Sequence, residues 1–150
     1  MALNSYFDFA ENDFRYFKAS YDAGIVANMM GAMAQGICEK YMKHLISEYY
    51  KPDDAMQQKD FENILRTHSL NRLMKFLKGN MGAEFSKNTQ THMRMIDGFY
   101  FSTRYPGAVS SKKCLKMEIY IQNTVAGTTR CRWRILSTEF FLVSRQRSGL

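Results

Sequence analysis

The hydrophobic pattern of the chain is helical along most of its first hundred residues. Residues 23–50 contain no proline and keep apolar side chains on a broad face, which predicts one long helix at the centre of the fold. Small residues recur along this helix at i, i+4, i+7 and i+11. They are Ala27, Gly31, Ala34 and Cys38. Because small side chains let two helices approach closely, this row is expected to contact a neighbouring helix.

A first amphipathic helix is predicted before the long one, because aromatic and small apolar residues recur there with helical spacing. These residues are Phe7, Ala10, Phe14, Phe17 and Tyr21. Asp22 is placed to cap the start of the long helix, and Lys51 and Pro52 are expected to end it. Residues 51–59 would then form a polar connection.

Two further helices are predicted after a short helical turn at 60–65. Apolar residues repeat over 70–77, and the Gly-Asn pair at 79–80 is expected to end that helix. The next helix is predicted over 89–103, where apolar residues lie nearly all round. The Pro-Gly pair at 106–107 stops it.

The last part of the chain has a weaker pattern. A fifth helix is favoured over 114–128, although β-branched residues and partial alternation there oppose helix formation. The predicted fold is therefore all-α: an antiparallel up-and-down helical bundle of four main helices plus short extra helices. The domain is expected at 1–107. Residues 108–150 are expected to form a basic C-terminal segment with a last bundle helix and a tail.

Composition and charge limit the class of protein. With 150 residues and 45% hydrophobic composition, the chain suits a single folded domain. Its formal charge of +7 comes from the end of the chain. Residues 108–150 hold eight Lys and Arg against two acidic residues, whereas 1–107 hold thirteen against twelve. Three cysteines without CxxC spacing indicate a reduced, cytoplasmic setting, and no uncharged run reaches the ~20 residues of a membrane span.

Three short motifs follow one another on the predicted helices. The first is Gln-x-x-x-Glu-Lys-x-x-Lys at 35–43, and the second is Thr-His-x-Leu-x-x-Leu at 67–73. The third is Arg-Tyr-Pro at 104–106. Each motif alone is common, but in this order and at this spacing they make the chain resemble the HEPN domain family.

The resemblance implies a helical bundle that is often dimeric and is commonly paired with a small nucleotidyltransferase domain. Some members are metal-independent endoribonuclease toxins, whereas others are thought to bind nucleotides or to act as non-catalytic scaffolds. The ribonuclease members carry an Arg followed by a His after four to six residues. No Arg of this chain has a His at that offset, so the resemblance favours a non-catalytic role.

Seven motif residues are candidates for ligand binding. They are Gln35, Glu39, Lys40, Lys43, His68, Arg104 and Tyr105. Gln35, Glu39 and Lys43 share a helix face, which could be a polar patch for a phosphate-bearing ligand or a partner domain, or a solvated or helix-contacting ion pair. His68 precedes a helix whose first N–H groups suit an anion, or it bonds to a neighbouring helix. Arg104 and Tyr105 could instead close a helix end by charge and packing.

The basic tail offers a second candidate surface. Its Arg side chains could contact phosphates while its Trp stacks on a base, although a solvated tail is the alternative. The residues are Arg130, Arg132, Trp133 and Arg134. His44 and Glu48 are four residues apart but lack a third ligand, so neither a metal nor a cofactor is predicted.

The sequence therefore predicts a HEPN-type non-catalytic binding or scaffold protein. It is expected to form a homodimer and to act with a nucleotidyltransferase-like partner or a nucleotide-containing ligand, with no membrane partner. Two alternatives stay open. One is an endoribonuclease toxin of a toxin–antitoxin pair, which would use His68 with Arg66 or Arg104. The other is an RNA-binding module that uses the basic tail.

Overall fold

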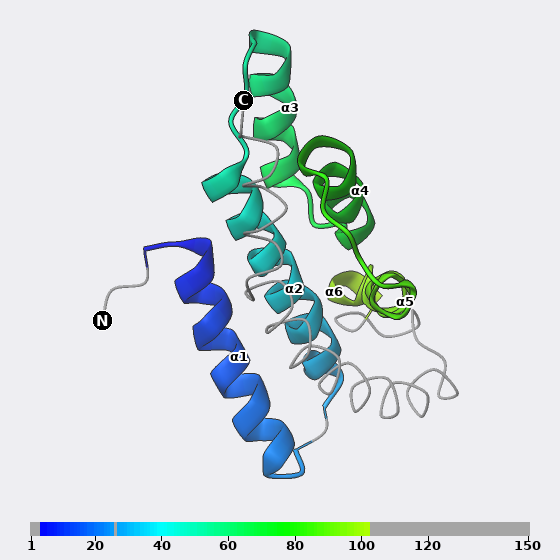
Figure 1. The fold of residues 1–150 in the computed structure, drawn as a ribbon. Helices are drawn as coiled ribbons and strands as arrows, with labels where there is room; N and C mark the ends of the chain where they lie inside the picture. The colour runs from blue at the N-terminus through cyan, green and yellow to red at the C-terminus, as the bar shows by residue number, and fades with distance from the viewer. Residues whose placement is uncertain (1–3, 26, 103–150) are drawn as a thin grey trace.

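The computed structural model describes residues 4–25 and 27–102, and within these residues all regular structure is helical (Figure 1). This confirms the predicted all-α bundle. The helices are α1 (Tyr6–Asp22), α2 (Asn28–Tyr49), α3 (Ala55–Arg66), α4 (Leu70–Met81), α5 (Lys87–Ile96) and α6 (Phe99–Ser102). No helix in the described part is long and apolar enough to cross a membrane.

Helix α1 begins at a capping box and lies antiparallel to α2 (Figure 1). The Ser5 hydroxyl accepts from the Asp8 N–H at 3.1 Å, and the Asp8 carboxylate accepts from the Ser5 N–H at 3.2 Å. These bonds satisfy N–H groups that the first helical turn leaves without partners. The face that carries Ala10, Phe14 and Phe17 is buried, as the aromatic spacing predicts.

Helix α2 starts later than predicted. The single helix expected over 23–50 is wrong at its beginning, because Gly24 adopts a positive φ of 73° and separates two helices. Asp22 ends α1 instead of capping α2, whose N-cap is the extended residue Ala27. The remaining 22 residues of α2 form the centre of the bundle.

Helix α3 is a full helix where a polar connection over 51–59 and a short turn over 60–65 were expected, so that prediction is wrong. Asp54 caps it, accepting from the Gln57 N–H at 2.7 Å, which allows the polar stretch after it to enter the helix. Ile64 is buried near the end of α3.

The ends of the later helices also differ from prediction. Helix α4 continues through Gly79 to Met81 and stops at Gly82, whose φ of +65° is the left-handed cap that glycine favours. The helix expected over 89–103 is interrupted, because Gly98 has a φ of +94° and turns the chain between α5 and α6.

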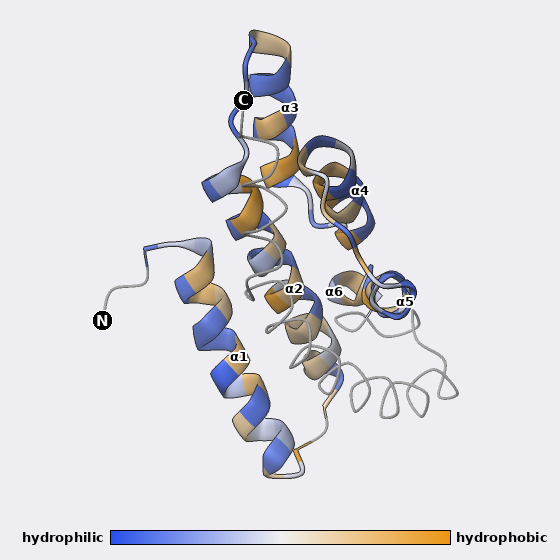
Figure 2. Ribbon diagram, viewed as in Figure 1, coloured by the Kyte–Doolittle hydropathy of each residue, from blue (hydrophilic) through white to orange (hydrophobic). Residues whose placement is uncertain are grey.

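Two clusters of buried apolar residues hold the bundle together. One lies between α1 and α2 and includes Phe17 and Ile37; the other joins α2 to α3, α4 and α5 and includes Ile46 and Leu73. Orange segments accordingly follow α2 and its facing helices in Figure 2. Phe99 of α6 packs against both clusters, which places α6 on α2.

The predicted row of small residues explains how α6 reaches α2. Gly31, Ala34 and Cys38 are buried, whereas Ala27 is exposed. A Cβ at Gly31 would lie 2.8 Å from the Phe99 ring, so the close approach of this ring requires glycine. The row therefore contacts a neighbouring helix at Gly31, as the sequence predicts, whereas the expected contact of Ala27 is wrong.

Candidate functional site

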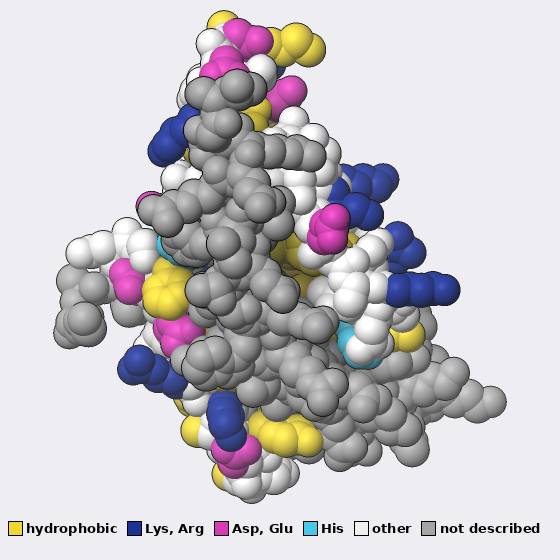
Figure 3. Space-filling model, in the orientation of Figure 1, with side chains coloured by type: hydrophobic (Ala, Val, Ile, Leu, Met, Phe, Trp, Pro, Cys, Tyr) yellow, Lys and Arg dark blue, Asp and Glu magenta, His cyan; other side chains and the backbone are white. Residues whose placement is uncertain are grey.

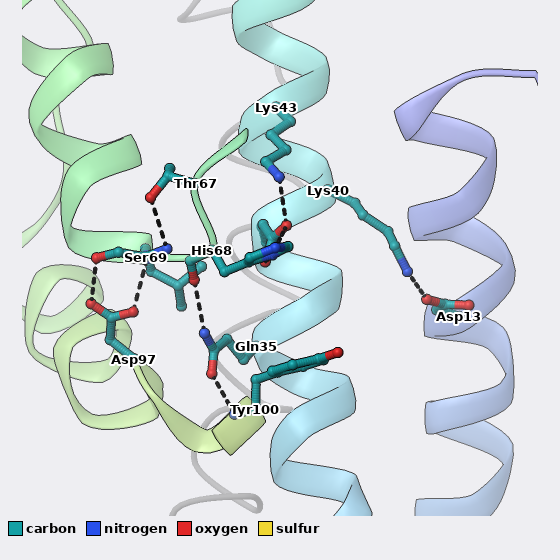
Figure 4. Close-up of polar contacts among 11 residues, drawn as sticks. Asp13, Gln35, Lys40, Lys43, Thr67, His68, Ser69, Asp97 and Tyr100 are labelled. Atoms are coloured by element: carbon teal, nitrogen blue, oxygen red, sulfur yellow. Dashed lines mark hydrogen bonds and ion pairs between the residues drawn. The ribbon is translucent and has the colours of Figure 1, made fainter. Parts of the chain in front are cut away.

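A buried ion pair on α2 forms the centre of the candidate site (Figure 4). The Lys43 ammonium lies 2.7 Å from the Glu39 carboxylate, and their side chains are only 6% and 13% exposed. The same carboxylate lies 3.1 Å from Nδ1 of His68, which precedes α4. Glu39 thus joins the central helix to the second family-like motif.

His68 is the solvent-facing member of this group. Its side chain is 59% exposed, and its ring stacks on Tyr100 of α6 with an interplanar angle of 6° and centroids 5.9 Å apart. In the neutral tautomer whose Nδ1–H donates to Glu39, Nε2 is an acceptor. The carboxylate and the tyrosine ring therefore hold the imidazole in a defined orientation.

Lys43 is covered from the α1 side. Its ammonium lies 6.0 Å from the centroid of the Tyr6 ring, a geometry that stabilises a cation over an aromatic face. Together with the Glu39 carboxylate, this environment neutralises the charge of Lys43 inside the fold. Glu39 and Lys43 of the predicted polar patch therefore form an ion pair that contacts neighbouring helices. Of Glu39, Lys43 and His68, only His68 is mostly exposed to solvent.

Gln35 braces three parts of the fold. It is 1% exposed; its Nε2 donates to the His68 carbonyl at 2.9 Å, and its Oε1 accepts from the Tyr100 N–H at 2.8 Å. Both ends of the amide are bonded to backbone groups, as a buried amide requires. Gln35 therefore sets the positions of His68 and Tyr100 relative to α2.

Lys40 lies apart from this group. Its ammonium bonds to the Asp13 carboxylate of α1, so it ties α1 to α2 (Figure 4). The structure thus brings together four of the predicted residues, which are Gln35, Glu39, Lys43 and His68. Lys40 instead forms a contact between α1 and α2.

Asp97 is a residue of the site that the sequence prediction missed. Its carboxylate accepts from the Ser69 hydroxyl at 3.0 Å, from the Leu70 N–H at 2.9 Å and from the Asn71 N–H at 3.2 Å. The Asn71 side-chain amide also donates to it at 2.7 Å. The signal was the Asp-Gly pair at 97–98, which is unfavourable inside a helix and typical of a turn.

The Asp97 carboxylate changes the prediction for the start of α4. The first N–H groups of that helix were expected to suit an external anion, but the chain's own carboxylate occupies them. The start of α4 is thus a structural junction between α4 and the turn that leads to α6.

Several predicted residues lie outside the described residues and their placement is not tested. They are Arg104, Tyr105, Arg130, Arg132, Trp133 and Arg134. His44 packs against Phe7 with ring centroids 5.2 Å apart, and its buried Nδ1 has no hydrogen-bond partner in the described part of the chain. Residues 4–25 and 27–102 contain no group of three or more potential metal ligands.

Fold and site together define a helical-bundle domain whose polar motif residues join its central helix to the start of α4 and to α6. The family model for the HEPN domain matches residues 4–123, which is four fifths of the chain. The chain belongs to the HEPN domain family. The match extends past residue 107 into the segment that was expected to supply a last bundle helix. No curated protein and no solved structure is significantly similar to the chain.

Proposed function

We propose that this protein is a non-catalytic HEPN-type binding or scaffold protein that acts as a homodimer with a nucleotidyltransferase-like partner. The observation that carries the proposal is the set of contacts around Glu39. Its carboxylate is shared by Lys43 and His68, and Gln35 fixes the backbone on both sides of the His68–Tyr100 stack. These motif residues build a rigid surface from which one imidazole is exposed.

The same contacts favour a partner protein over a nucleotide ligand. A bound phosphate would need a cation or helix N–H groups, and here Lys43 is paired with Glu39 while the start of α4 is occupied by Asp97. A rigid exposed ring beside a second aromatic suits a protein interface, where such residues contribute much of the binding energy. Binding of a nucleotide-containing ligand is the alternative version of the proposed binding function.

Size-exclusion chromatography tests the proposal. The full chain is mixed with the nucleotidyltransferase-domain protein encoded nearest to its gene, and the mass of the complex is measured by light scattering. We expect the free chain at twice its monomer mass of 17.5 kDa and a heavier co-eluting complex with the partner. Separate elution of the two proteins, together with no calorimetric signal for ATP, would contradict the proposal.

One observation favours an endoribonuclease as the second candidate function. A largely buried carboxylate that orients an exposed imidazole is the arrangement of a general base, and the Glu39–His68 pair has it. The chain lacks the family's Arg-to-His spacing, and Arg66 is the exposed arginine nearest to His68 in sequence. RNA cleavage by the purified chain that disappears in His68→Ala would establish this function and rule out the non-catalytic one.

A further inference from the structure

The charges of the described residues are divided between two parts of the fold. Residues 4–69 hold seven Lys and Arg against ten Asp and Glu, whereas 70–102 hold five against two. One of those two, Asp97, is bonded to the start of α4. The helices α4 and α5 are therefore the basic side of a bundle whose other described helices are acidic or neutral.

The five cations of α4 and α5 are all exposed and lie on the solvent side of their helices. They are Arg72, Lys75 and Lys78 of α4 and Lys87 and Arg94 of α5. The opposite sides carry the buried residues, such as Leu73 and Leu77 on α4 and Met93 on α5. Figure 3 shows Lys and Arg side chains gathered along the edge of the molecule where α4 and α5 lie.

These cations have no acidic partner among the described residues, in contrast to three of the four cations of α1 and α2. Lys18, Lys40 and Lys43 each pair with a carboxylate. No ion pair within the described residues includes a cation of α4 or α5. No carboxylate of the described residues therefore neutralises the basic face by an ion pair.

The dimensions of the basic face suit an extended polyanion. Six residues separate Arg72 from Lys78 on α4, a rise of about 9 Å, and seven separate Lys87 from Arg94 on α5, a rise of about 10 Å. The two helices pack against each other, so their cations form one surface. Such a surface can contact several phosphates of one chain.

The composition of the face distinguishes a nucleic-acid backbone from a protein partner. No exposed large hydrophobic side chain lies on α4, and α5 carries one, Met95. Protein interfaces depend on aromatic and apolar anchors, and single-stranded nucleic acids on aromatic stacking. A charged face with neither feature suits the phosphate backbone of a duplex, which is bound without reading sequence.

We propose that the α4–α5 face binds the phosphate backbone of a double-stranded nucleic acid. The ligand contacts would come from Arg72, Lys75 and Arg94, with Lys78 and Lys87 at the margins. These residues are distinct from His68 and from the arginines of the basic tail, so the proposal does not depend on the proposed partner function.

Fluorescence anisotropy tests the proposal. It measures the affinity of the full chain for labelled 20-base-pair RNA and DNA duplexes at several salt concentrations. The test variant is the triple substitution Arg72→Gln, Lys75→Gln, Arg94→Gln. The control variant removes three exposed cations elsewhere, with Arg15→Gln, Lys51→Gln and Lys59→Gln. Both variants have the same net charge, so only the position of the lost charge differs. Circular dichroism checks that both variants fold.

We expect the test variant to bind at least about tenfold more weakly at 50 mM salt, and its slope of log affinity against log salt to be lower by about 2 to 3. The control variant should bind like the wild type. Equal binding of the test and control variants would overturn the proposal, as would the absence of duplex binding by the wild type. Binding lost only when Arg130, Arg132 and Arg134 become Gln would assign it to the tail. Anionic vesicles or polyglutamate that bind as tightly as the duplex would contradict the nucleic-acid assignment.

Discussion

At the scale of single residues, buried polar side chains decide how the motif residues are used. Gln35 is a family-like motif residue with 1% exposure, and both ends of its amide bond to backbone groups. Glu39 is likewise shared between a buried ammonium and an exposed imidazole. An unpaired buried polar group lowers the stability of the fold by more than one hydrogen bond raises it. Substitutions at these side chains are therefore expected to be destabilising.

Replacing Gln35 with Leu tests this role. The His68 carbonyl and the Tyr100 N–H would each lose the bond that Gln35 supplies, so we expect a loss of about 2 kcal/mol or more in the free energy of unfolding. Urea denaturation measures it. Gln58→Leu, an exposed amide on α3, is the control and should change stability by less than about 0.5 kcal/mol. Equal effects of the two substitutions would contradict the bracing role.

Asp8 gives a prediction for pH dependence. The Ser5 hydroxyl, which bonds to the Asp8 carboxylate at 2.9 Å, holds the pKa of Asp8 below its ordinary value of 3.8. A lowered pKa in the folded state means that the ionised carboxylate stabilises the fold above about pH 4 and that this contribution is lost as the pH falls further. Asp8→Asn should therefore destabilise the protein at pH 7 and make progressively less difference below pH 4. Thermal melts at several pH values measure the difference, and a constant difference would contradict the assignment.

At the scale of elements, glycines determine where the helices end and how closely they approach. Gly24 and Gly98 adopt positive φ and divide stretches that the hydrophobic pattern predicts as continuous. Gly31 acts differently, because it lies inside α2 and admits the ring of Phe99. Position within the element therefore decides what a glycine contributes.

Two glycines of α2 make a matched pair for mutation. A Cβ at Gly31 would lie 2.8 Å from the Phe99 ring, whereas a Cβ at Gly36 would have no heavy atom within 4 Å. We expect Gly31→Ala to destabilise the fold by about 1–3 kcal/mol through overpacking. Gly36→Ala should stabilise it by up to about 1 kcal/mol, because alanine is the better helix former. Chemical denaturation of both variants gives the comparison, and stabilisation by Gly31→Ala would refute the packing of α6 on α2.

The junction of α4 with α6 depends on one carboxylate. Asp97 accepts bonds from Ser69, Leu70 and Asn71, so Asp97→Ala should cost about 1–3 kcal/mol of stability. Asp60→Ala removes an exposed carboxylate from α3 and serves as the control. Hydrogen exchange should also rise at the first turn of α4 in Asp97→Ala. Unchanged exchange there would show that Asp97 does not cap this helix.

At the scale of the whole molecule, the sequence predicts the bundle better than it predicts the site. Apolar spacing identifies α1 and α4 because each buries one face, and it identifies α2 because this central helix is apolar on a broad surface that faces both core clusters. The apolar pattern does not predict the first part of α3, because this part is polar. Its formation depends on the Asp54 cap and on packing near the end of the helix. The Asp-Gly pair at 97–98 indicates a turn, but no local pattern indicates that Asp97 bonds to the start of α4, 26 to 28 residues earlier.

The sequence predicts four residues that the fold brings together, but it does not predict how they are arranged. The motifs identify Gln35, Glu39, Lys43 and His68, which the fold brings together. Which of them face solvent depends on how α4 and α6 pack on α2, and spacing along one helix does not reveal it. The sequence therefore does not distinguish the buried Gln35 from the exposed His68.

The most direct test of the account is the affinity of the His68→Ala variant for the nucleotidyltransferase-domain partner, measured by isothermal titration calorimetry. His92→Ala removes a half-buried histidine of α5 and is the matched control. We expect His68→Ala to weaken the complex by about tenfold or more, as for an exposed aromatic at an interface, and His92→Ala to leave the affinity unchanged. Equal affinity of the wild type and both variants would contradict the claim that the His68 surface is the binding site.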